Sequence, residues 1–360
     1  MKREIEQEMS YLQVTAKEQL HEWVEQIKEF SSEGKTADYI PALKDMDSSQ
    51  LGICLIGADG TVIQSGDYES VFTLQSISKV ISFIAACLCC GIPYVLERVD
   101  VEPTGDAFNS IIRLEMHKPG KPFNPMINAG ALTVSSLLSG ETAKEKLSYL
   151  FDVITMLTGK TPLINETVFE SEWQTSHRNR ALAYYLKETN YLQGEVEEVL
   201  EVYLKQCSIE VTTEDIALIG LILSLDGYHP VFHKQVIPKE VAKLTKALML
   251  TCGMYNASGK FAAFVGMPAK SGVSGGIMSL VPPNTKKQSP FPDGCGIGIY
   301  SPAIDEYGNS VKGVTLLKKI AKAVNTPAKR PLTSRPRCNK KLLAVNKRAL
   351  HHAVVGVLEG

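Results

Sequence analysis

The chain has 360 residues, of which 44% are hydrophobic and 21% charged, and its formal net charge at pH 7 is −1. These values describe a soluble globular protein and give no reason to expect nucleic acid as a partner. No apolar run reaches the roughly 20 residues of a membrane span, and the charged start, Met1 to Met9, has no apolar segment like that of a secretory signal. We therefore expect a cytoplasmic protein that binds neither nucleic acid nor membrane.

Cysteine and histidine give no indication of a metal site. The eight cysteines lie mostly in apolar runs without C-x-x-C spacing, and the seven histidines form no H-E-x-x-H or H-x-H pair. In Cys87-Leu88-Cys89-Cys90 a helix would point the three thiols in different directions. We expect reduced cysteines that pack as small core residues, with no metal and no cofactor.

The N-terminal part begins with a helix and continues with a hairpin. Residues 15–32 place Leu, Trp, Val, Ile and Phe side chains at helical spacing. Residues 51–56 form an apolar, β-branched run, Asp59-Gly60 is a hairpin turn signal, and residues 61–64 return from the turn. This order predicts two antiparallel strands after the first helix.

The middle of the chain is mostly helical, and its C-terminal part is again β. Helical periodicity occurs at residues 131–138, 143–157, 181–187, 196–206, 213–225 and 238–250. Two polar stretches, residues 121–130 and 172–179, are predicted to be loops. Glycine-rich strands at residues 274–281 and 295–300 and a last helix at residues 310–323 complete the pattern.

These elements predict an α/β (α+β) fold in which one antiparallel sheet is flanked by helices. The sheet domain would comprise residues 1–75 and 251–325, and a mainly helical domain, residues 76–250, would be inserted, with the Ser76 helix at the interface. The tail, residues 326–360, has eight basic residues and one acidic residue. Such a tail can bind nucleic acid or acidic lipid, but we expect a poorly ordered appendage.

A short stretch carries the first sign of chemistry. A β-leaning run ends at Ser76, where a helical run begins, and Lys79 follows three residues later. Residues three apart share one face of a helix, so Lys79 could activate Ser76 as a nucleophile. A helix N-terminus also lowers the pKa of a neighbouring lysine and offers N–H donors to an oxyanion. The alternative is a helix-capping serine beside a solvated lysine.

A second cluster, K-S-G-V-S-G-G at residues 270–276, lies where the sheet resumes. Small residues after a lysine let a substrate approach the backbone, and a strand edge beside Ser76 would supply a second N–H to an oxyanion hole. Alone, the glycines would indicate a bulge or a tight turn. Together with Ser76 and Lys79, the layout is that of serine acyl-transfer enzymes of the β-lactamase and penicillin-binding type.

Several short motifs follow one another in an order that is typical of one enzyme family. They are A-D-Y-I-P at residues 37–41, Q-S-I-S-K at 75–79, K-P at 121–122, N-P-M-I-N-A-G at 124–130, R-N at 178–179, C-S-I-E at 207–210, M-Y at 254–255 and A-K-S-G-V-S-G-G at 269–276. With them the chain resembles the serine-dependent β-lactamase-like glutaminases, from about Tyr39 to about Lys318. The resemblance implies a β-lactamase/transpeptidase-like sheet with a helical domain, hydrolysis of L-glutamine to L-glutamate and ammonia, and a homo-oligomer, dimer or tetramer.

The resemblance also implies roles for single residues. Ser76 is similar to the family nucleophile and Lys79 to its base, and Tyr255 is the candidate that protonates the departing ammonia. The implied substrate-binding residues are Tyr39, Ser76, Asn128, Glu172, Asn179, Tyr203, Tyr255 and Val273. In the resulting scheme the backbone N–H groups of Ser76 and Val273 hold the oxyanion, and water hydrolyses a γ-glutamyl ester on Ser76.

The residue types suit a free amino acid. Glu172 is the acid that would pair with the α-ammonium of glutamine, and Asn128, Asn179 and Tyr203 would donate hydrogen bonds to its carboxylate. Without the resemblance, these would be a solvated loop glutamate, two loop-capping asparagines and a tyrosine at the edge of the core. Two other functions stay open: another serine acyl-hydrolase of the same fold, such as a β-lactamase or peptidase, and a glutamine sensor without catalytic activity.

Overall fold

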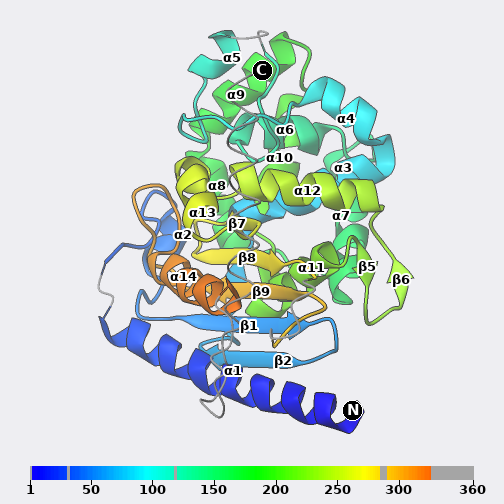
Figure 1. Ribbon diagram of the computed structural model, residues 1–360. Helices are drawn as coiled ribbons and strands as arrows, with labels where there is room; N and C mark the ends of the chain where they lie inside the picture. Colours follow the sequence, from blue (N-terminus) through cyan, green and yellow to red (C-terminus); the bar gives the residue numbers. More distant parts are fainter. Residues whose placement is uncertain (1, 31–32, 117–119, 284–289, 326–360) are drawn as a thin grey trace, which may run out of the picture. The chain divides into compact units, whose positions relative to one another are not determined.

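Five antiparallel strands form the central sheet, in the order β2-β1-β9-β8-β7 (Figure 1). Their bounds are β1 Gly52–Gly57, β2 Val62–Gly66, β7 Ala269–Ser271, β8 Gly276–Val281 and β9 Cys295–Tyr300. The predicted hairpin is confirmed, with Leu55 opposite Ile63 in the β1–β2 pair. Strand β9 lies between β1 and β8, so the sheet joins two parts of the chain that are far apart in the sequence.

The computed structural model describes residues 2–30, 33–116, 120–283 and 290–325. Residues Met1–Asn325 form one compact unit, which contains all of the described residues. The prediction of a poorly ordered tail at residues 326–360 lies outside the described residues. Within the described ranges, no helix combines the length and the apolar character needed to cross a membrane.

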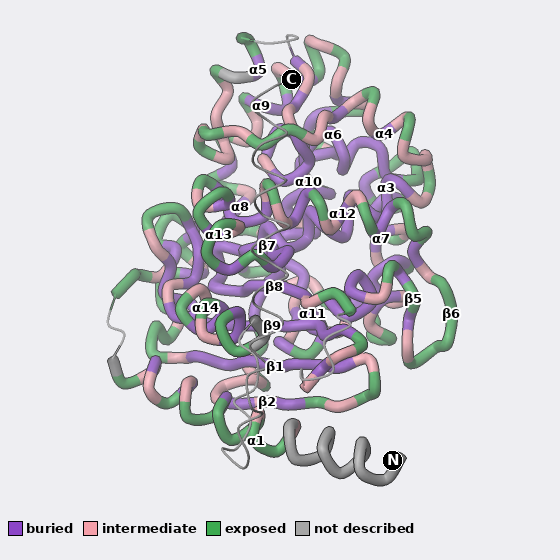
Figure 2. The backbone as a smooth tube through the Cα atoms, in the orientation of Figure 1, coloured by how far each residue is buried: buried purple, intermediate pink, exposed green. Residues whose placement is uncertain are grey.

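The two faces of the sheet are buried against different helices. Helices α1 (Lys2–Phe30) and α14 (Val311–Asn325) pack on one face, and α11 (Thr213–Ser224) packs on the other (Figure 1). Neighbouring residues of β1 point to opposite sides, so that Ile53 joins the cluster with α1 and α14, whereas Cys54 contacts the cluster with α11. The tube in Figure 2 accordingly shows β1, β8 and β9 as almost entirely buried.

Helix α11 approaches β9 closely because two strand positions that face it are glycines. A Cβ atom added to Gly296 would overlap the carbonyl oxygen of Ala217, and one added to Gly298 would overlap that of Thr213. Since both obstacles are backbone atoms of α11, no side-chain rotation could make room. The two glycines therefore set the distance between helix and strand.

Gly296→Ala is expected to lower the free energy of unfolding by about 3 kcal/mol or more, because the added methyl group collides with backbone that cannot move away. Gly259→Ala is the matched control. An added Cβ at Gly259, in α13 (Ser258–Phe264), would meet nothing within 4 Å, so a neutral or slightly stabilising effect is expected. Urea unfolding measures both, and equal free energies for the two variants would contradict the close helix–strand contact.

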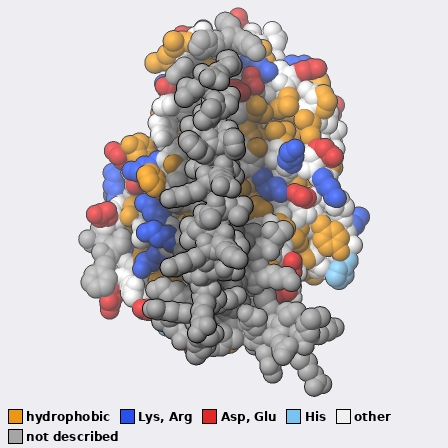
Figure 3. Space-filling model, viewed as in Figure 1, with side chains coloured by type: hydrophobic (Ala, Val, Ile, Leu, Met, Phe, Trp, Pro, Cys, Tyr) orange, Lys and Arg blue, Asp and Glu red, His pale blue; other side chains and the backbone are white. Residues whose placement is uncertain are grey.

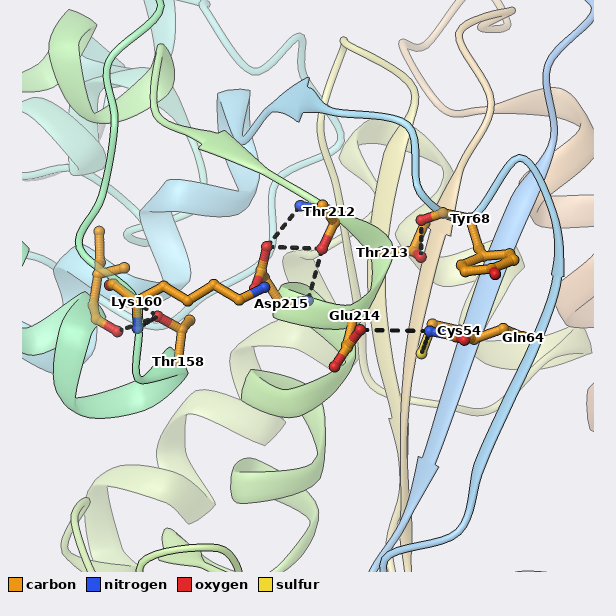
Figure 4. A network of polar contacts seen from close by, with 10 residues as sticks. Cys54, Gln64, Tyr68, Thr158, Lys160, Thr212, Thr213, Glu214 and Asp215 are labelled. Atoms are coloured by element: carbon orange, nitrogen blue, oxygen red, sulfur yellow. Dashed lines mark hydrogen bonds and ion pairs between the residues drawn. The ribbon is translucent and has the colours of Figure 1, made fainter.

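A polar network fixes the first turn of α11 (Figure 4). The Thr212 hydroxyl accepts a hydrogen bond from the backbone N–H of Asp215, and the Asp215 carboxylate accepts one from the N–H of Thr212 at 2.8 Å. Lys160 Nζ lies 2.6 Å from the same carboxylate. This capping box satisfies backbone donors that the first helical turn leaves free, and it places a negative charge at the helix N-terminus.

The other helices mostly lie between β2 and β7 in the sequence. Their bounds are α2 Pro41–Lys44, α3 Ser78–Cys90, α4 Ile92–Arg98, α5 Ile112–Met116, α6 Asn128–Ser136, α7 Ala143–Thr158, α8 Glu166–Thr175, α9 His177–Glu188, α10 Val196–Cys207, α12 Lys239–Cys252 and α13. Two short antiparallel pairs, β3 Phe72–Thr73 with β4 Glu210–Val211 and β5 Tyr228–His229 with β6 Lys234–Gln235, accompany them. Buried side chains of α3, α7 and α12 form one cluster with α11, and those of α6, α9 and α10 form a second.

The loop predicted at residues 172–179 is wrong, because all of these residues except Ser176 belong to α8 or α9. Only Val168 and Glu172 of α8 are buried, so the helix shows too little apolar periodicity to be found from sequence. Its start is fixed locally, since the Asn165 side chain accepts a hydrogen bond from the N–H of Val168. The other predicted loop, residues 121–130, is partly wrong, since α6 begins at Asn128.

Helix α14 has one buried face and one basic, exposed face. Leu316, Leu317 and Ile320 are buried, whereas Lys318 and Lys322 are exposed. Blue side chains accordingly gather over the region of α14 in Figure 3. The last helix predicted at residues 310–323 is confirmed, and its buried and exposed faces make it amphipathic.

Candidate active site

The turn between β7 and β8 packs against the segment that leads into α3. The turn closes with a hydrogen bond of 2.9 Å from Gly272 N to Gly276 O. The Ser274 hydroxyl donates to the carbonyl of Thr73 at 2.7 Å and so holds the turn against β3. The glycines at residues 272–276 thus form a tight turn. Among the hydrogen bonds between described residues, none uses the backbone N–H of Val273 within this turn.

Ser76 lies in a 3₁₀ turn, η1 (Gln75–Ile77), that runs directly into α3. The residue is buried, with 8% of its surface exposed. Gln75 before it has φ of 47°, and Tyr255, which hydrogen-bonds to Ser76, has φ of 50°. Both angles lie in the left-handed region, which costs free energy for residues other than glycine. Ser76 is therefore adjacent to two residues with strained backbone: Gln75 precedes it in the chain and Tyr255 contacts its side chain.

Lys79 is fully buried in the first turn of α3. Its ammonium donates to Asn128 Oδ1 at 2.6 Å and to the carbonyl of Met126 at 3.3 Å. Burial lowers the pKa of Lys79 from 10.5 to about 8, against smaller opposing effects of Cys207 and Glu172. Burial, and not the helix N-terminus invoked from sequence, is thus the main cause. A lysine with this pKa is partly neutral near pH 7 and can accept a proton.

Two asparagines continue from Lys79 as a hydrogen-bonded chain. Asn128 accepts from Lys79 through Oδ1 and donates through Nδ2 to Asn179 Oδ1 at 2.9 Å. These bonds fix the orientation of both amide groups. These two bonds use one amide hydrogen of Asn128 and none of Asn179, so among the described residues they leave both amide hydrogens of Asn179 for a ligand.

Glu172 on α8 is buried, and its Oε2 has no hydrogen-bond partner among the described residues. Burial raises the pKa of Glu172 to about 8, while a hydrogen bond with Gln75 and the charge of Lys79 act in the opposite direction. A buried carboxylate oxygen without a partner is costly in free energy. The arrangement therefore suits a small cation, such as an ammonium group, beside Glu172.

Tyr255 and Lys270 share an acceptor behind Ser76. The Tyr255 hydroxyl donates to the carbonyl of Ser271 at 3.0 Å, and Lys270 Nζ donates to the same oxygen at 2.6 Å. Lys270 Nζ also lies 4.4 Å from the centre of the Tyr255 ring. Burial raises the pKa of Tyr255 and lowers that of Lys270 well below its usual value. Tyr255 therefore keeps its proton at neutral pH and has it available for donation.

Most of the predicted site residues line one cavity of about 160 Å³. They are Tyr39, Ser76, Asn128, Glu172, Asn179, Tyr203 and Val273. Lys79 and Tyr255 stand directly behind this wall, in contact with Asn128 and Ser76 respectively. Tyr39 is 55% exposed and lies at the rim. The cavity is small beside the roughly 300–1,000 Å³ of sites for drug-sized ligands, so it suits a molecule of amino-acid size.

Nine further residues of the cavity wall were not named as site residues from the sequence. They are Ile40, Gln75, Phe108, Asn109, Thr175, Ser176, Arg178, Leu204 and Cys207. Gln75 connects to Glu172, and its place beside Ser76 in the Q-S-I-S-K motif was the available signal. The Phe108 ring lies 5.0 Å from that of Tyr255 and brings an apolar surface for which the sequence holds no local signal.

Comparison with known proteins identifies the family. The sequence profile of the Glutaminase family matches residues 34–327. The chain belongs to the Glutaminase family. A curated relative, Glutaminase 1 of Bacillus subtilis (strain 168), is 71% identical over 303 residues, which are 84% of this chain and 93% of that protein. The resemblance inferred from the motifs is therefore confirmed, and the chain is a hydrolase of this family.

Solved glutaminase structures have the same mixed α/β fold. The crystal structure of a probable glutaminase of Bacillus subtilis has a TM-score of 0.82 and 68% identity, and the match covers 86% of this chain and 97% of that chain. A second structure is the covalent complex of the Bacillus subtilis glutaminase with 5-oxo-L-norleucine, formed by reaction with 6-diazo-5-oxo-L-norleucine. Its TM-score is 0.76 at 64% identity, over 85% of this chain and 97% of that chain.

The Lys79–Asn128 contact leads to a prediction for the pH dependence of the glutaminase reaction. Asn128→Asp places a carboxylate about where the amide oxygen lies, 2.6 Å from Lys79 Nζ. A negative charge so close favours the ammonium form and should raise the Lys79 pKa by about 1–3 units. The acidic limb of kcat/KM is expected to move to higher pH by the same amount. Asn190→Asp, at an exposed position, is the control, and an unshifted limb in Asn128→Asp would contradict Lys79 as the titrating base.

Proposed function

We propose that this chain hydrolyses L-glutamine to L-glutamate and ammonia in the cavity around Ser76. The observation that carries the proposal is one small cavity that holds Ser76, with the buried Lys79 directly behind its wall, together with a Glu172 oxygen that lacks a partner among the described residues. The first element attacks an amide, and the second receives an α-ammonium group.

The relative that reacts covalently with 6-diazo-5-oxo-L-norleucine supports this assignment. The product, 5-oxo-L-norleucine, is an α-amino acid with a carbonyl group at carbon 5. Glutamine has its carboxamide carbon at the same position. A cavity like that of the relative would thus present the glutamine carboxamide to a nucleophile.

In the proposed complex, Glu172 pairs with the α-ammonium of glutamine. Asn179 donates its amide hydrogens to the α-carboxylate, together with the remaining hydrogen of Asn128 and the hydroxyl of Tyr203. Tyr39 would cover the bound amino acid from the rim of the cavity. A free amino acid satisfies all of these groups at once, whereas a peptide or a β-lactam lacks either the ammonium or the carboxylate at the required distance.

The acylation step begins when neutral Lys79 removes the proton of Ser76, directly or through the Tyr255 hydroxyl. Ser76 Oγ attacks the carboxamide carbon, and the backbone N–H groups of Ser76 and Val273 hold the oxyanion. Tyr255 then protonates the departing nitrogen and regains a proton from the Lys79 ammonium, so that ammonia leaves. Water attacks the resulting γ-glutamyl ester on Ser76 and releases L-glutamate.

Ammonia release from L-glutamine tests the proposal, with Ser76→Ala as the control. L-Asparagine, D-glutamine and the β-lactam nitrocefin serve as alternative substrates. Turnover of L-glutamine by the unmodified protein, lost in Ser76→Ala, is the expected result. Preferential hydrolysis of nitrocefin would favour a β-lactamase, and glutamine binding without ammonia release would favour a sensor.

The finer organisation is also proposed on this basis. Residues 1–75 and 251–325 would act as a β-lactamase/transpeptidase-like sheet domain and residues 76–250 as the inserted helical domain, with Ser76 between them. The protein would work in the cytoplasm as a dimer or tetramer, and residues 326–360 would be dispensable for turnover. Sedimentation tests the oligomeric state. An activity assay of the chain without residues 326–360 tests whether these residues are dispensable, and loss of activity in that chain would contradict this proposal.

A further inference from the structure

Two cysteines end helix α3 with their sulfur atoms close together. Cys89 Sγ and Cys90 Sγ are 3.2 Å apart, Cys89 is exposed and Cys90 is half-buried. The sequence-based expectation that these thiols diverge is wrong for this pair. The reason is a shared acceptor, because the carbonyl of Leu137 lies 3.5 Å from Cys89 Sγ and 3.2 Å from Cys90 Sγ, although the single Cys89 S–H can also donate to the carbonyl of Ala86 at 3.5 Å.

The thiol pair lies at the far end of the two helices that carry Lys79 and Asn128. Helix α3 contains Lys79 in its first turn, and α6 begins with Asn128, which accepts from Lys79. At the other end, Leu137 is the C-cap residue of α6 and receives both thiols. Hydrogen bonds therefore connect α3 to α6 at both ends, one beside the catalytic serine and one at the surface.

The end of α6 depends on these contacts. Lys146 Nζ donates to the carbonyls of Ser136 and Leu138 at 3.0 and 2.8 Å. The carbonyl of Leu137 between them is left to the two thiols. Loss of both S–H donors would leave a carbonyl at the helix C-terminus without its partners and free α3 from α6 there.

The pair is better suited to a bridging atom than to a disulfide. Adjacent Cα atoms are about 3.8 Å apart, which is below the about 4.4–6.8 Å usual for disulfide partners. Burial raises the pKa of Cys89 to about 12, so single alkylation through a thiolate is slow. A soft, thiophilic atom can instead bond to both sulfur atoms while its own leaving group accepts the two thiol protons. Such a reaction requires neither a preformed thiolate nor a direct S–S bond.

We propose that Cys89 and Cys90 form a dithiol site for trivalent arsenicals, and that occupation of this site slows glutamine hydrolysis by separating α3 from Leu137. With an arsenic(III) oxide R–As=O, two As–S bonds form, the two S–H protons pass to the oxide oxygen, and water leaves. No atom changes its oxidation state, so no oxidant or reductant is required. The effect on hydrolysis rests on the proposed function, whereas capture itself does not.

Phenylarsine oxide is the probe, used on the full chain. Intact-protein mass spectrometry is expected to find one phenylarsenic group gained with the loss of two thiol hydrogens. The kcat for glutamine is expected to fall by about fivefold or more, the lower end of the usual coupling between separate sites. The dithiol 2,3-dimercaptopropanol should restore the activity, and excess 2-mercaptoethanol should not.

The double variant Cys89→Ser, Cys90→Ser is the decisive control, because serine hydroxyls still donate to Leu137. It should keep its basal activity, bind no phenylarsenic group and lose the inhibition, whereas Cys252→Ser should behave like the unmodified protein. Persistence of the adduct in the double variant overturns the site. An adduct on the unmodified protein without a change in kcat overturns the coupling. Mass spectrometry detects the adduct even if the protein does not hydrolyse glutamine, so failure of the proposed function can be distinguished from failure of the dithiol site.

Discussion

Lys79→Ala is expected to lower kcat/KM for glutamine by about 10³-fold or more, with the fold retained. The variant removes the ammonium group that donates to Asn128 and whose pKa burial lowers to about 8. Without a base, Ser76 Oγ keeps its proton and is a weak nucleophile for an amide. Ammonia release under saturating and limiting glutamine gives kcat and KM separately, and kcat should carry most of the loss.

Lys79→Arg separates the role of a base from that of a positive charge. Arginine stays protonated at all accessible pH values, so it preserves the charge beside Asn128 and Glu172 but cannot accept a proton. We expect this variant to be nearly as inactive as Lys79→Ala. Substantial activity in Lys79→Arg would show that a fixed cation suffices, and the proposed proton transfer from Ser76 would then be wrong.

In the unmodified protein, two titrating groups should both make kcat/KM rise with pH. In the proposed mechanism Lys79 acts only when it is neutral, and Glu172 binds an ammonium only when it is ionised. The pKa of each group is about 8. Both conditions are met increasingly as the pH rises through 8, so kcat/KM should rise over this interval. The two groups influence one another, so the limb reports apparent values for the pair.

Elements with a strong local pattern were predictable from the sequence. The hairpin around Asp59-Gly60, the glycine-rich strand β9 and the amphipathic α14 follow from short-range periodicity and turn chemistry. Helix α8 was not predictable, because its buried positions are few and one of them is the charged Glu172. An acid in a buried position weakens the apolar pattern, here at a residue to which we assign a role in the proposed function.

The site was predictable as a set of residues but not as a network. The motifs indicated Asn128 and Asn179, yet only the fold connects Lys79, Asn128 and Asn179 through successive hydrogen bonds. The strained backbone of Gln75 is likewise a tertiary property, since glutamine has no preference for a left-handed φ. The pKa of Lys79 depends on burial by surrounding elements, which no local pattern contains.

Glu172→Gln is expected to raise KM for glutamine by about tenfold to a hundredfold, with a smaller change in kcat. The variant keeps the size and position of the side chain but removes the charge that would pair with the α-ammonium. The loss corresponds to about 1.5–3 kcal/mol, the usual contribution of a hydrogen bond to a charged group. Because glutamine at position 172 does not titrate, the acidic limb of kcat/KM in this variant should reflect the pKa of Lys79 alone.

The control for Glu172 lies on the same helix. Glu170 is exposed on α8, so Glu170→Gln removes an equal charge from the same element without touching the cavity. It should leave KM, kcat and the pH profile unchanged. If Glu172→Gln and Glu170→Gln have equal KM values, Glu172 does not bind the α-ammonium. The missing hydrogen-bond partner of Glu172 Oε2 among the described residues would then have another cause. Loss of kcat at unchanged KM would instead assign Glu172 to the chemical step, where its charge lies near Lys79.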